Sequence, residues 1–253
     1  MVTLRLDALG ACYGRNPVLS DITTAAFKGG EVVALIGPNA AGKSSLFKRM
    51  AGIIDGPGRA VIEGARGNGI VYMPQDSATN AVLTVYESVL LARKQDASWS
   101  VGQADLAIAD EVLGKLGISG LSMRNLGELS GGQRQLVSIA QVLAREPEIL
   151  MMDEPTSALD LKRQMQVLEF IRGLATERGL LIFLAIHDLN QVLRFADKVM
   201  VLAGGGLHAA GATREVLTAD MLRRVYGVDA RIEACSRGIP QIIVDGAVDE
   251  TPA

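Results

Sequence analysis

Three short apolar runs along the chain predict buried strands. They are Val32–Ile36, Ile149–Met152 and Leu180–Ile186, and each has the length of a strand covered on both faces. Each run is followed by a helical pattern: Ser44–Ala51, Lys162–Thr176 and Leu189–Phe195. Because buried strands that alternate with helices are typical of parallel sheets, the sequence predicts an α/β fold.

Two other parts of the chain show the alternation of half-buried antiparallel strands. Val2–Leu6 and Leu19–Phe27 alternate apolar and polar residues, which predicts an antiparallel β part at the N-terminal end. Further on, Val199–Leu202 and Leu207–Ala210 flank a run of three glycines, a pattern typical of a hairpin.

The middle of the chain is helical. Thr84–Arg93, Ala104–Leu116 and Gly132–Ala144 have helical patterns with no strand-like run between them. We therefore expect one domain over residues 1–253. It has a core of residues 1–76 and 147–217, an inserted helical subdomain of residues 77–146 and a C-terminal extension of residues 218–253. A helix at Ala219–Tyr226 and a strand at Gln241–Val244 are expected in the extension.

Composition narrows the class of protein. Of 253 residues, 49% are hydrophobic, which suits a folded core, and the mean hydropathy of +0.25 comes from residues spread along the chain rather than from one apolar span. We expect no signal peptide and no membrane-crossing segment. The net charge is −3 with Lys and Arg scattered among acids, so no nucleic-acid partner is expected. Cys12 and Cys235 are too few for a disulfide framework, and reduced thiols are expected.

Residues 37–44 fit the phosphate-loop pattern G-x-x-x-x-G-K-[ST], between a predicted strand and a predicted helix. The glycines let successive backbone N–H groups point at phosphate oxygens. Lys43 can reach the β- and γ-phosphates, and the Ser44 hydroxyl can ligate Mg²⁺. The expected nucleotide-binding residues are Gly37, Pro38, Asn39, Ala40, Ala41, Gly42, Lys43 and Ser44.

Polar side chains follow two of the predicted buried strands. Asp153 and Glu154 end one strand at the carboxyl edge of the sheet, where ligands bind in open α/β folds. Asp153 can belong to the Mg²⁺ shell, and Glu154 can polarise a water aimed at the γ-phosphate. His187 follows another strand and can bond to a γ-phosphate or orient the water. Taken alone, a strand-end cap and a structural histidine explain these residues as well.

Leu129–Gln135 places Ser130, Gly131 and Gly132 at the start of a helix. A serine cap with exposed N–H groups makes a second anion site on the chain. Because one nucleotide cannot easily occupy both sites, two copies are expected to enclose ATP, each phosphate loop facing the other copy's Ser130–Gly132. A plain helix cap is the alternative if the motif is taken alone.

In this order, the motifs resemble the ATP-binding subunit of an ABC transporter from about residue 3 to 217, and Leu129–Gln133 is the most specific of them. The resemblance implies a P-loop NTPase core of the ABC ATPase type, with ATP and Mg²⁺ as cofactors. Within it, Glu154 matches the catalytic base and His187 the switch histidine. The resemblance also implies that Tyr13 stacks on adenine and that Gln75 binds near Mg²⁺ and the γ-phosphate. Further implied nucleotide-binding residues are Ser45 of the phosphate cradle, Gln133 of the signature motif and Asp160 of the loop Ser157–Asp160.

Two positions depart from the family's phosphate loop. Ala40 stands where Gly is usual, and Ser45 where Thr is usual. Ser45 keeps the hydroxyl. An alanine is tolerated at position 40 if its φ is negative, so neither departure is expected to break the phosphate cradle.

Two further segments resemble a subset of the family. Thr84–Arg93 is similar to a helix of importers of ferric siderophores, haem and cobalamin, and the tail around Val225–Val228 and Ile243–Gly246 is most similar to ferric-siderophore subunits. The resemblance implies a second copy of the chain, a dimeric membrane permease and, indirectly, a periplasmic or lipoprotein binding protein. It places the chain at the cytoplasmic face of the cell membrane.

The docking site for the permease is expected on the helical subdomain near Gln75. Val82, Leu83, Tyr86 and Leu90 form part of this site or pack within the helices. A soluble ABC ATPase acting on ribosomes or DNA is an alternative function. It is disfavoured because the chain has one cassette, no heptads and no basic tract. A P-loop kinase does not explain Ser130–Gly132.

Overall fold

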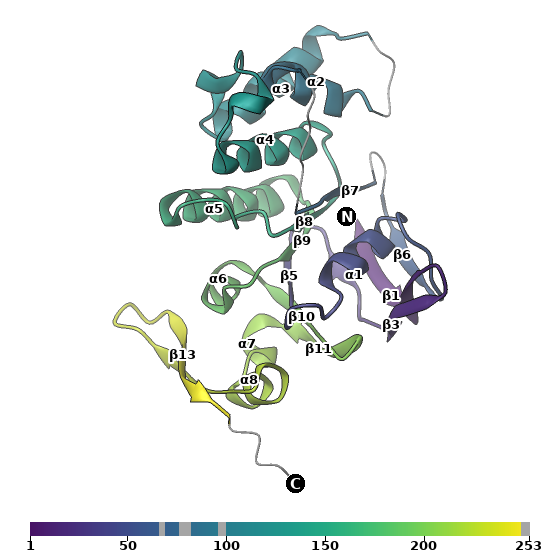
Figure 1. Cartoon of the computed structure of the whole chain (residues 1–253), viewed down its shortest axis with the longest axis vertical. Helices are drawn as coiled ribbons and strands as arrows, with labels where there is room; N and C mark the ends of the chain where they lie inside the picture. The colour runs from purple at the N-terminus through teal and green to yellow at the C-terminus, as the bar shows by residue number, and fades with distance from the viewer. Residues whose placement is uncertain (66–68, 76–81, 96–99, 249–253) are drawn as a thin grey trace.

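A parallel sheet lies at the centre of the computed structural model, which describes residues 1–65, 69–75, 82–95 and 100–248 (Figure 1). Its six strands are β11 (Gly206–Ala212), β10 (Lys198–Ala203), β5 (Val32–Ile36), β9 (Leu181–Ala185), β8 (Ile149–Asp153) and β7 (Ile70–Met73), in that order. All neighbours pair in parallel except β10 and β11, which form the expected hairpin. The predicted α/β fold is confirmed.

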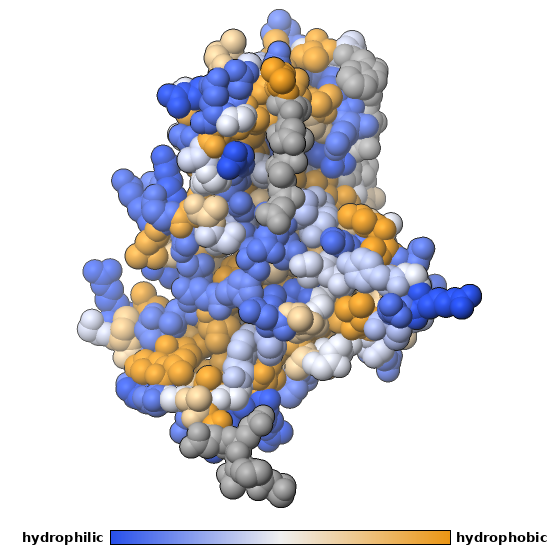
Figure 2. Space-filling view, viewed as in Figure 1, coloured by the Kyte–Doolittle hydropathy of each residue, from blue (hydrophilic) through white to orange (hydrophobic). Residues whose placement is uncertain are grey.

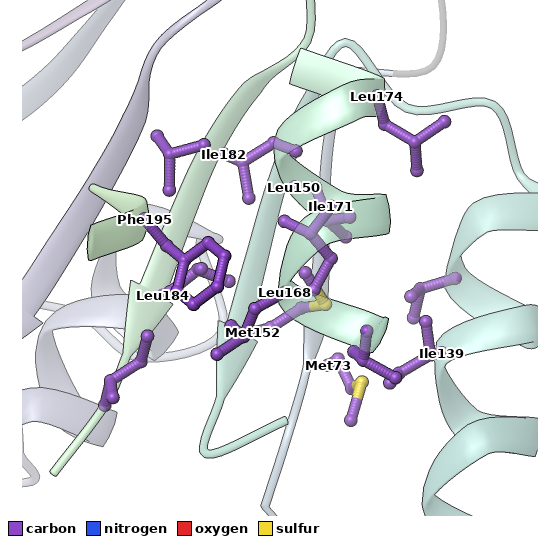
Figure 3. Packing of buried hydrophobic residues seen from close by; sticks show 14 of the residues in the cluster. Met73, Ile139, Leu150, Met152, Leu168, Ile171, Leu174, Ile182, Leu184 and Phe195 are labelled. Atoms are coloured by element: carbon purple, nitrogen blue, oxygen red, sulfur yellow. The ribbon is translucent and has the colours of Figure 1, made fainter. Parts of the chain in front are cut away.

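Residues of the buried strands alternate between two apolar layers. On one face, Leu35 and Phe183 pack with Phe47 of α1 (Lys43–Met50). On the other face, Leu150, Met152, Ile182 and Leu184 pack beneath α5 (Leu161–Arg178) and α6 (Leu189–Phe195), as Figure 3 shows for Leu168 and Ile171 of α5. Because both faces are covered, the strands read as continuous apolar runs, which is why three of them were predictable.

The antiparallel β part contains five strands. They are β1 (Thr3–Asp7), β2 (Leu9–Tyr13), β3 (Asn16–Ile22), β4 (Phe27–Lys28) and β6 (Arg59–Glu63). The prediction of one strand over Leu19–Phe27 is wrong, because β3 ends at Ile22 and β4 begins at Phe27. The threonine hydroxyls between them accept hydrogen bonds from the β1 side of the chain, Thr24 from Leu6 N–H and Thr23 from Ala8 N–H, in place of a backbone ladder.

Three helices form the upper end of the molecule in Figure 1: α2 (Val85–Arg93), α3 (Gln103–Lys115) and α4 (Gly131–Ala144), with 3₁₀ turns at Ser119–Leu121 and Leu126–Glu128. Arg93 joins the helices, since it donates to Asp105 of α3 at 2.7 Å and to the carbonyl of Ala144 at 2.8 Å. The subdomain limits at residues 77 and 146 remain a prediction, and residues 77–81 lie outside the described residues.

The C-terminal part adds α7 (Thr213–Val216), α8 (Ala219–Tyr226), β12 (Val228–Ala234) and β13 (Pro240–Ala247). The predicted helix at Ala219–Tyr226 is confirmed, and the predicted strand lies within β13. Its antiparallel partner β12 was missed, although Val228, Ala230 and Ile232 alternate with polar residues. In the part of the chain that the structure describes, no helix is both long and apolar enough to cross a membrane.

Candidate active site

The register of the central sheet brings the candidate residues together at its carboxyl edge. Asp153 of β8 and Leu35 of β5 both lie opposite Ala185 of β9, and Met73 of β7 lies opposite Met152. The next residues along each strand therefore meet at one edge. These are the phosphate loop after β5, His187 after β9, Glu154 after β8 and Gln75 after β7.

The phosphate loop is shaped by two glycines with positive φ. Gly37 has a φ of 151°, and a Cβ there would lie 2.3 Å from the carbonyl oxygen of Leu202. Gly42 has a φ of 97°, and a Cβ there would meet the Leu19 side chain. The loop thus closes around the start of α1, whose free N–H groups suit phosphate oxygens.

Lys43 is buried and folded back along this loop. Its Nζ donates to the carbonyl oxygens of Gly37 at 2.8 Å and Pro38 at 3.1 Å. Burial lowers the pKa of the Lys43 ammonium, and the nearby carboxylates of Glu154 and Asp153 oppose that shift. The ammonium therefore lies between the loop and the acids, where it can meet phosphate charge.

Ala40 does not meet the condition under which an alanine is tolerated without strain. Its φ is 61°, in the left-handed region that favours glycine. The turn between Pro38 and Ala41, whose N–H donates to the Pro38 carbonyl at 3.2 Å, holds Ala40 in that conformation. A non-glycine residue in this region costs about 1–2 kcal/mol.

Replacing Ala40 by Gly should therefore stabilise the protein. The gain is smaller than the strain, about 0.5–1 kcal/mol, because glycine also gains entropy in the unfolded chain. For a domain of this size we expect Tm to rise by about 1–4 °C. Ala51→Gly is the matched control, since Ala51 caps the C-terminal end of α1, the helix that follows the phosphate loop, with a φ of −79°, and its replacement should lower Tm. A fall in Tm for Ala40→Gly would mean that position 40 is not strained.

Asp153 and Ser44 provide oxygen donors that suit Mg²⁺. Asp153 is only 2% exposed, and one of its oxygens accepts a hydrogen bond from the Tyr72 hydroxyl at 3.3 Å. Burial raises the pKa of Tyr72, with the Asp153 carboxylate adding to the shift, so the phenol remains a donor. Among the described residues no group of three or more His, Cys, Asp or Glu could enclose a metal.

Glu154 sits in a strained backbone conformation that its neighbours maintain. Its φ is 51°. Its N–H donates to the carbonyl of Ala185 at 3.1 Å, and its own carbonyl accepts from Gln135 Nε2 at 3.0 Å and from Ser157 Oγ at 3.1 Å. Strain that is held by several bonds at a sheet edge is typical of active sites.

The Glu154 carboxylate lies between Gln75 and His187. Gln75 Nε2 donates to one oxygen at 2.9 Å, and His187 Nε2 is hydrogen bonded to the other. A cavity of about 210 Å³ lies beside them, lined in part by Thr156, Ser157 and Gln191. The structure thus brings together three residues that were proposed separately from the sequence.

Three glutamines near the site were missed by sequence reasoning. Gln135, two residues after the signature motif, holds the Glu154 carbonyl as described above. Gln191 of α6 donates to Gln164 of α5 at 2.9 Å, and Gln164 donates to the carbonyls of Thr156 and Leu159 at 3.3 and 3.0 Å. Both Gln135 and Gln191 are buried, so their amides have structural partners, but a glutamine within a helix carries no sequence pattern that predicts this.

Ser130 caps α4 with a capping box. Its Oγ accepts from Gln133 N–H at 3.3 Å, and Gln133 Oε1 accepts from Ser130 N–H at 3.0 Å. A Cβ on Gly132 would lie 2.9 Å from the carbonyl oxygen of Ala158, so the start of α4 packs tightly on the loop at Ser157–Asp160. Asp160 in turn caps α5 by accepting from Arg163 N–H at 2.9 Å.

A cavity of about 680 Å³ opens at the start of α4. Ser130, Gly132, Gln133, Ala158 and Asp160 are among its lining residues. No residue of 37–45 is among the described residues that line it. Among the described residues, the signature residues and the phosphate loop of the same chain therefore line no common wall of this cavity. Tyr13 lies at the end of β2 and is 45% exposed.

Comparison with known families decides the class of protein. Residues 21–157 match the ABC transporter family model. The chain belongs to this family, as an ATP-binding subunit. Along 97% of its length it is 38% identical to an uncharacterized ABC transporter ATP-binding protein of Methanocaldococcus jannaschii, 99% of which is covered.

Other relatives carry more specific names. The iron(3+)-hydroxamate import ATP-binding protein of Bacillus subtilis is 34% identical over 92% of this chain and 90% of its own. The hemin import ATP-binding protein of Bordetella bronchiseptica is 33% identical over 92% of this chain and 95% of its own. Among solved structures, an inward-facing ABC transporter provisionally classed as the metal-chelate type has a chain with a TM-score of 0.84 and 27% identity, covering 96% of this chain and 98% of that one. The ABC ATP-binding subunit is an ATPase.

Proposed function

We propose that this chain powers the import of a ferric siderophore through a membrane permease. The proposal rests on the relatives named for iron(3+)-hydroxamate and hemin import and on the tail from Val225 to Gly246, which is similar to ferric-siderophore subunits. Haem, cobalamin and other metal compounds are the alternative cargoes, since a relative 33% identical over 91% of this chain is named for cobalamin import. In this function the chain lies at the cytoplasmic face of the membrane, held there by the permease.

The observation that carries the proposed chemistry is the carboxylate of Glu154 held between Gln75 and His187. In this position Glu154 takes a proton from the attacking water, while His187 orients the carboxylate and bonds to the γ-phosphate. Lys43 and the backbone N–H groups of the phosphate loop neutralise phosphate charge. Ser44, Gln75 and Asp153 are the proposed Mg²⁺ ligands, and the ion would supply charge compensation between the β- and γ-phosphates.

A second copy of the chain completes the proposed site. The cavity at Ser130–Gln133 offers the free N–H groups of a helix start, whereas Lys43 belongs to a different cluster of its own chain. We propose that the cavity receives the γ-phosphate of ATP bound to the partner's phosphate loop, with Asp160 near the contact. Tyr13 remains exposed in the described structure, so its ring is accessible to stack on adenine.

The permease is proposed to dock on the helical end of the molecule. Among the described residues of this part, Val82 is 92% exposed and Met123 is 82% exposed, and Leu91 and Val101 are also exposed apolar side chains. Leu83, Tyr86 and Leu90 are partly buried and pack against the helical core. Val82 is therefore the most exposed of the four residues expected at the docking site. Leu83, Tyr86 and Leu90 also serve the packing of the helical core.

Replacing Gln75 by Ala should lower ATP hydrolysis in the assembled transporter and lower uptake with it. The Gln75 amide bonds to Glu154 just after β7, and the next described residue of the chain, Val82, lies shortly before α2. Its engagement with γ-phosphate and Mg²⁺ would change when ATP becomes ADP. ATP affinity should stay nearly unchanged, because Lys43 and the loop supply most of the binding. Uptake and ATPase rate are measured on one reconstituted preparation, and normal uptake would exclude Gln75 as the coupling residue.

The cargo is tested by reconstituting the chain with its permease in vesicles. ATP-dependent uptake of a ferric hydroxamate, haem and cobalamin is compared, with the Glu154→Gln variant as the background for each. The proposal predicts uptake of the ferric hydroxamate above that of the other two. If haem or cobalamin is taken up and the ferric hydroxamate is not, the proposed cargo is wrong. The assignment of the chain as an ATPase would be unaffected.

A further inference from the structure

A single side chain of α6 holds the outer edge of β13. Asn190 Nδ2 donates to the Ile242 carbonyl at 3.3 Å, and Ile242 N–H donates to Asn190 Oδ1 at 2.7 Å. Ile242 pairs with Ile232 of β12 on its other side. An amide that donates and accepts at one residue acts like a neighbouring strand, so Asn190 occupies the edge that β12 leaves open.

Asn190 also belongs to the turn that carries His187. The carboxylate of Asp188 caps α6 and accepts from Asn190 N–H at 2.8 Å and from Gln191 N–H at 3.2 Å. The backbone of Asn190 is thus tied to Asp188, the residue next to His187, while its side chain is tied to β13. Any shift of β13 relative to α6 must therefore move this turn or break two hydrogen bonds.

Buried apolar side chains anchor the β12–β13 hairpin and the preceding helix α8 to the core. Met221 and Leu222 of α8 are buried in the same apolar layer as Ile36, and Ile242 is 8% exposed. Burial raises the pKa of Tyr226 to about 12, against a smaller lowering by a hydrogen bond from the backbone N–H of Gly37. The end of α8 therefore rests beside the first residue of the phosphate loop.

The hairpin's other surface faces outward. Figure 1 shows β13 beside α6, at the lower left of the molecule, and Figure 2 shows apolar side chains gathered there. Val244 on β13 is exposed, whereas Ile242 points into the buried layer. Ile242 of β13 therefore packs against the core, whereas Val244 does not.

We propose that Asn190 is a positioning residue through which the β12–β13 hairpin fixes the orientation of His187 toward Glu154. The C-terminal extension is then a working part of the ATPase site, although none of its residues needs to touch the reacting atoms. This inference rests on the proposed role of His187. A misplaced histidine weakens the alignment of carboxylate, water and γ-phosphate, so the loss falls on the chemical step.

The test is a double-mutant cycle on ATP hydrolysis by the full chain. Asn190→Ala should lower kcat about five- to tenfold and change the KM for ATP by no more than about twofold, because the phosphate cradle is untouched. In the His187→Ala background, Asn190→Ala should cause no further loss, since the side chain that it positions is gone. Arg194→Ala on the same helix is the matched control, because its ion pair with Glu169 is exposed and its loss should leave kcat unchanged.

Asn190→Asp provides a second variant should the alanine variant unfold. It keeps the acceptor for Ile242 N–H and loses the donor, so its kcat should lie between those of the wild type and the alanine variant. An equal loss from Asn190→Ala with and without His187 would overturn the inference and leave the role of His187 intact. An unchanged kcat for Asn190→Ala would also overturn it. A near-normal kcat for His187→Ala would overturn the proposed role of His187 and this inference with it.

Discussion

The variant Glu154→Gln is expected to bind ATP and to hydrolyse it at least about a hundredfold more slowly than the wild type, which is the usual effect of losing a positioned general base. Glutamine has nearly the shape of glutamate but cannot take a proton from water. The strained backbone should be retained, because the N–H donated to the Ala185 carbonyl and the carbonyl that accepts from Gln135 and Ser157 both belong to the main chain of residue 154. The ATP-bound variant should accumulate as a dimer that does not reopen.

Two measurements check this expectation. Single-turnover release of phosphate gives the hydrolysis rate, and gel filtration with ATP gives the dimer. Glu169→Gln is the matched control, because Glu169 is an exposed residue of α5 whose contact with Arg194 is 3.5 Å long. Its rate should equal that of the wild type. Near-normal turnover by Glu154→Gln would show that Glu154 is not the general base.

Ser130→Arg should abolish hydrolysis while each separate chain still binds ATP. Ser130 is exposed at the mouth of the cavity and caps α4, and Gly132 has no room for a side chain against Ala158. An arginine here places a bulky cation where the partner's γ-phosphate is proposed to lie. ATP affinity should remain, because Lys43 and the phosphate loop lie in another cluster.

Thr176→Arg is the control for the added positive charge of Ser130→Arg. Thr176 is an exposed residue near the end of α5, and its replacement adds the same charge away from the cavity. Its hydrolysis rate should stay near that of the wild type. Loss of ATP binding by the separate Ser130→Arg chain would place Ser130 in its own chain's nucleotide pocket and contradict the two-chain site.

The strands that are buried on both faces of the central sheet were the easiest part of the fold to predict. β5 and β9 are apolar at every position, and β8 is apolar at every position except its last, Asp153, so their runs stand out, and β5 was predicted to the residue. β7 has only four residues, Ile70–Met73, and was missed because so short a run matches several structures. The gap between β3 and β4 depends on hydrogen bonds that the Thr23 and Thr24 hydroxyls accept from distant backbone N–H groups, which no local pattern encodes.

The residue types of the site were predictable from motifs, but their contacts were not. A phosphate loop and a strand ending in Asp153–Glu154 indicate phosphate chemistry by themselves. The two bonds to the Glu154 carboxylate arise from sheet register, which joins residues 79 and 33 positions away. The positive φ of Ala40 is likewise imposed by the loop rather than by the residue, so the sign of φ could not be predicted from the sequence.

The most direct test of the shared site is to mix two inactive variants, Lys43→Ala and Ser130→Arg, and measure ATP hydrolysis. In a mixed dimer, one site carries both changes and the other carries neither. With equal amounts and random pairing, half of the dimers are mixed, so activity should recover to about a quarter of the wild-type rate. A mixture that stays as inactive as either variant alone would contradict a site built from two chains.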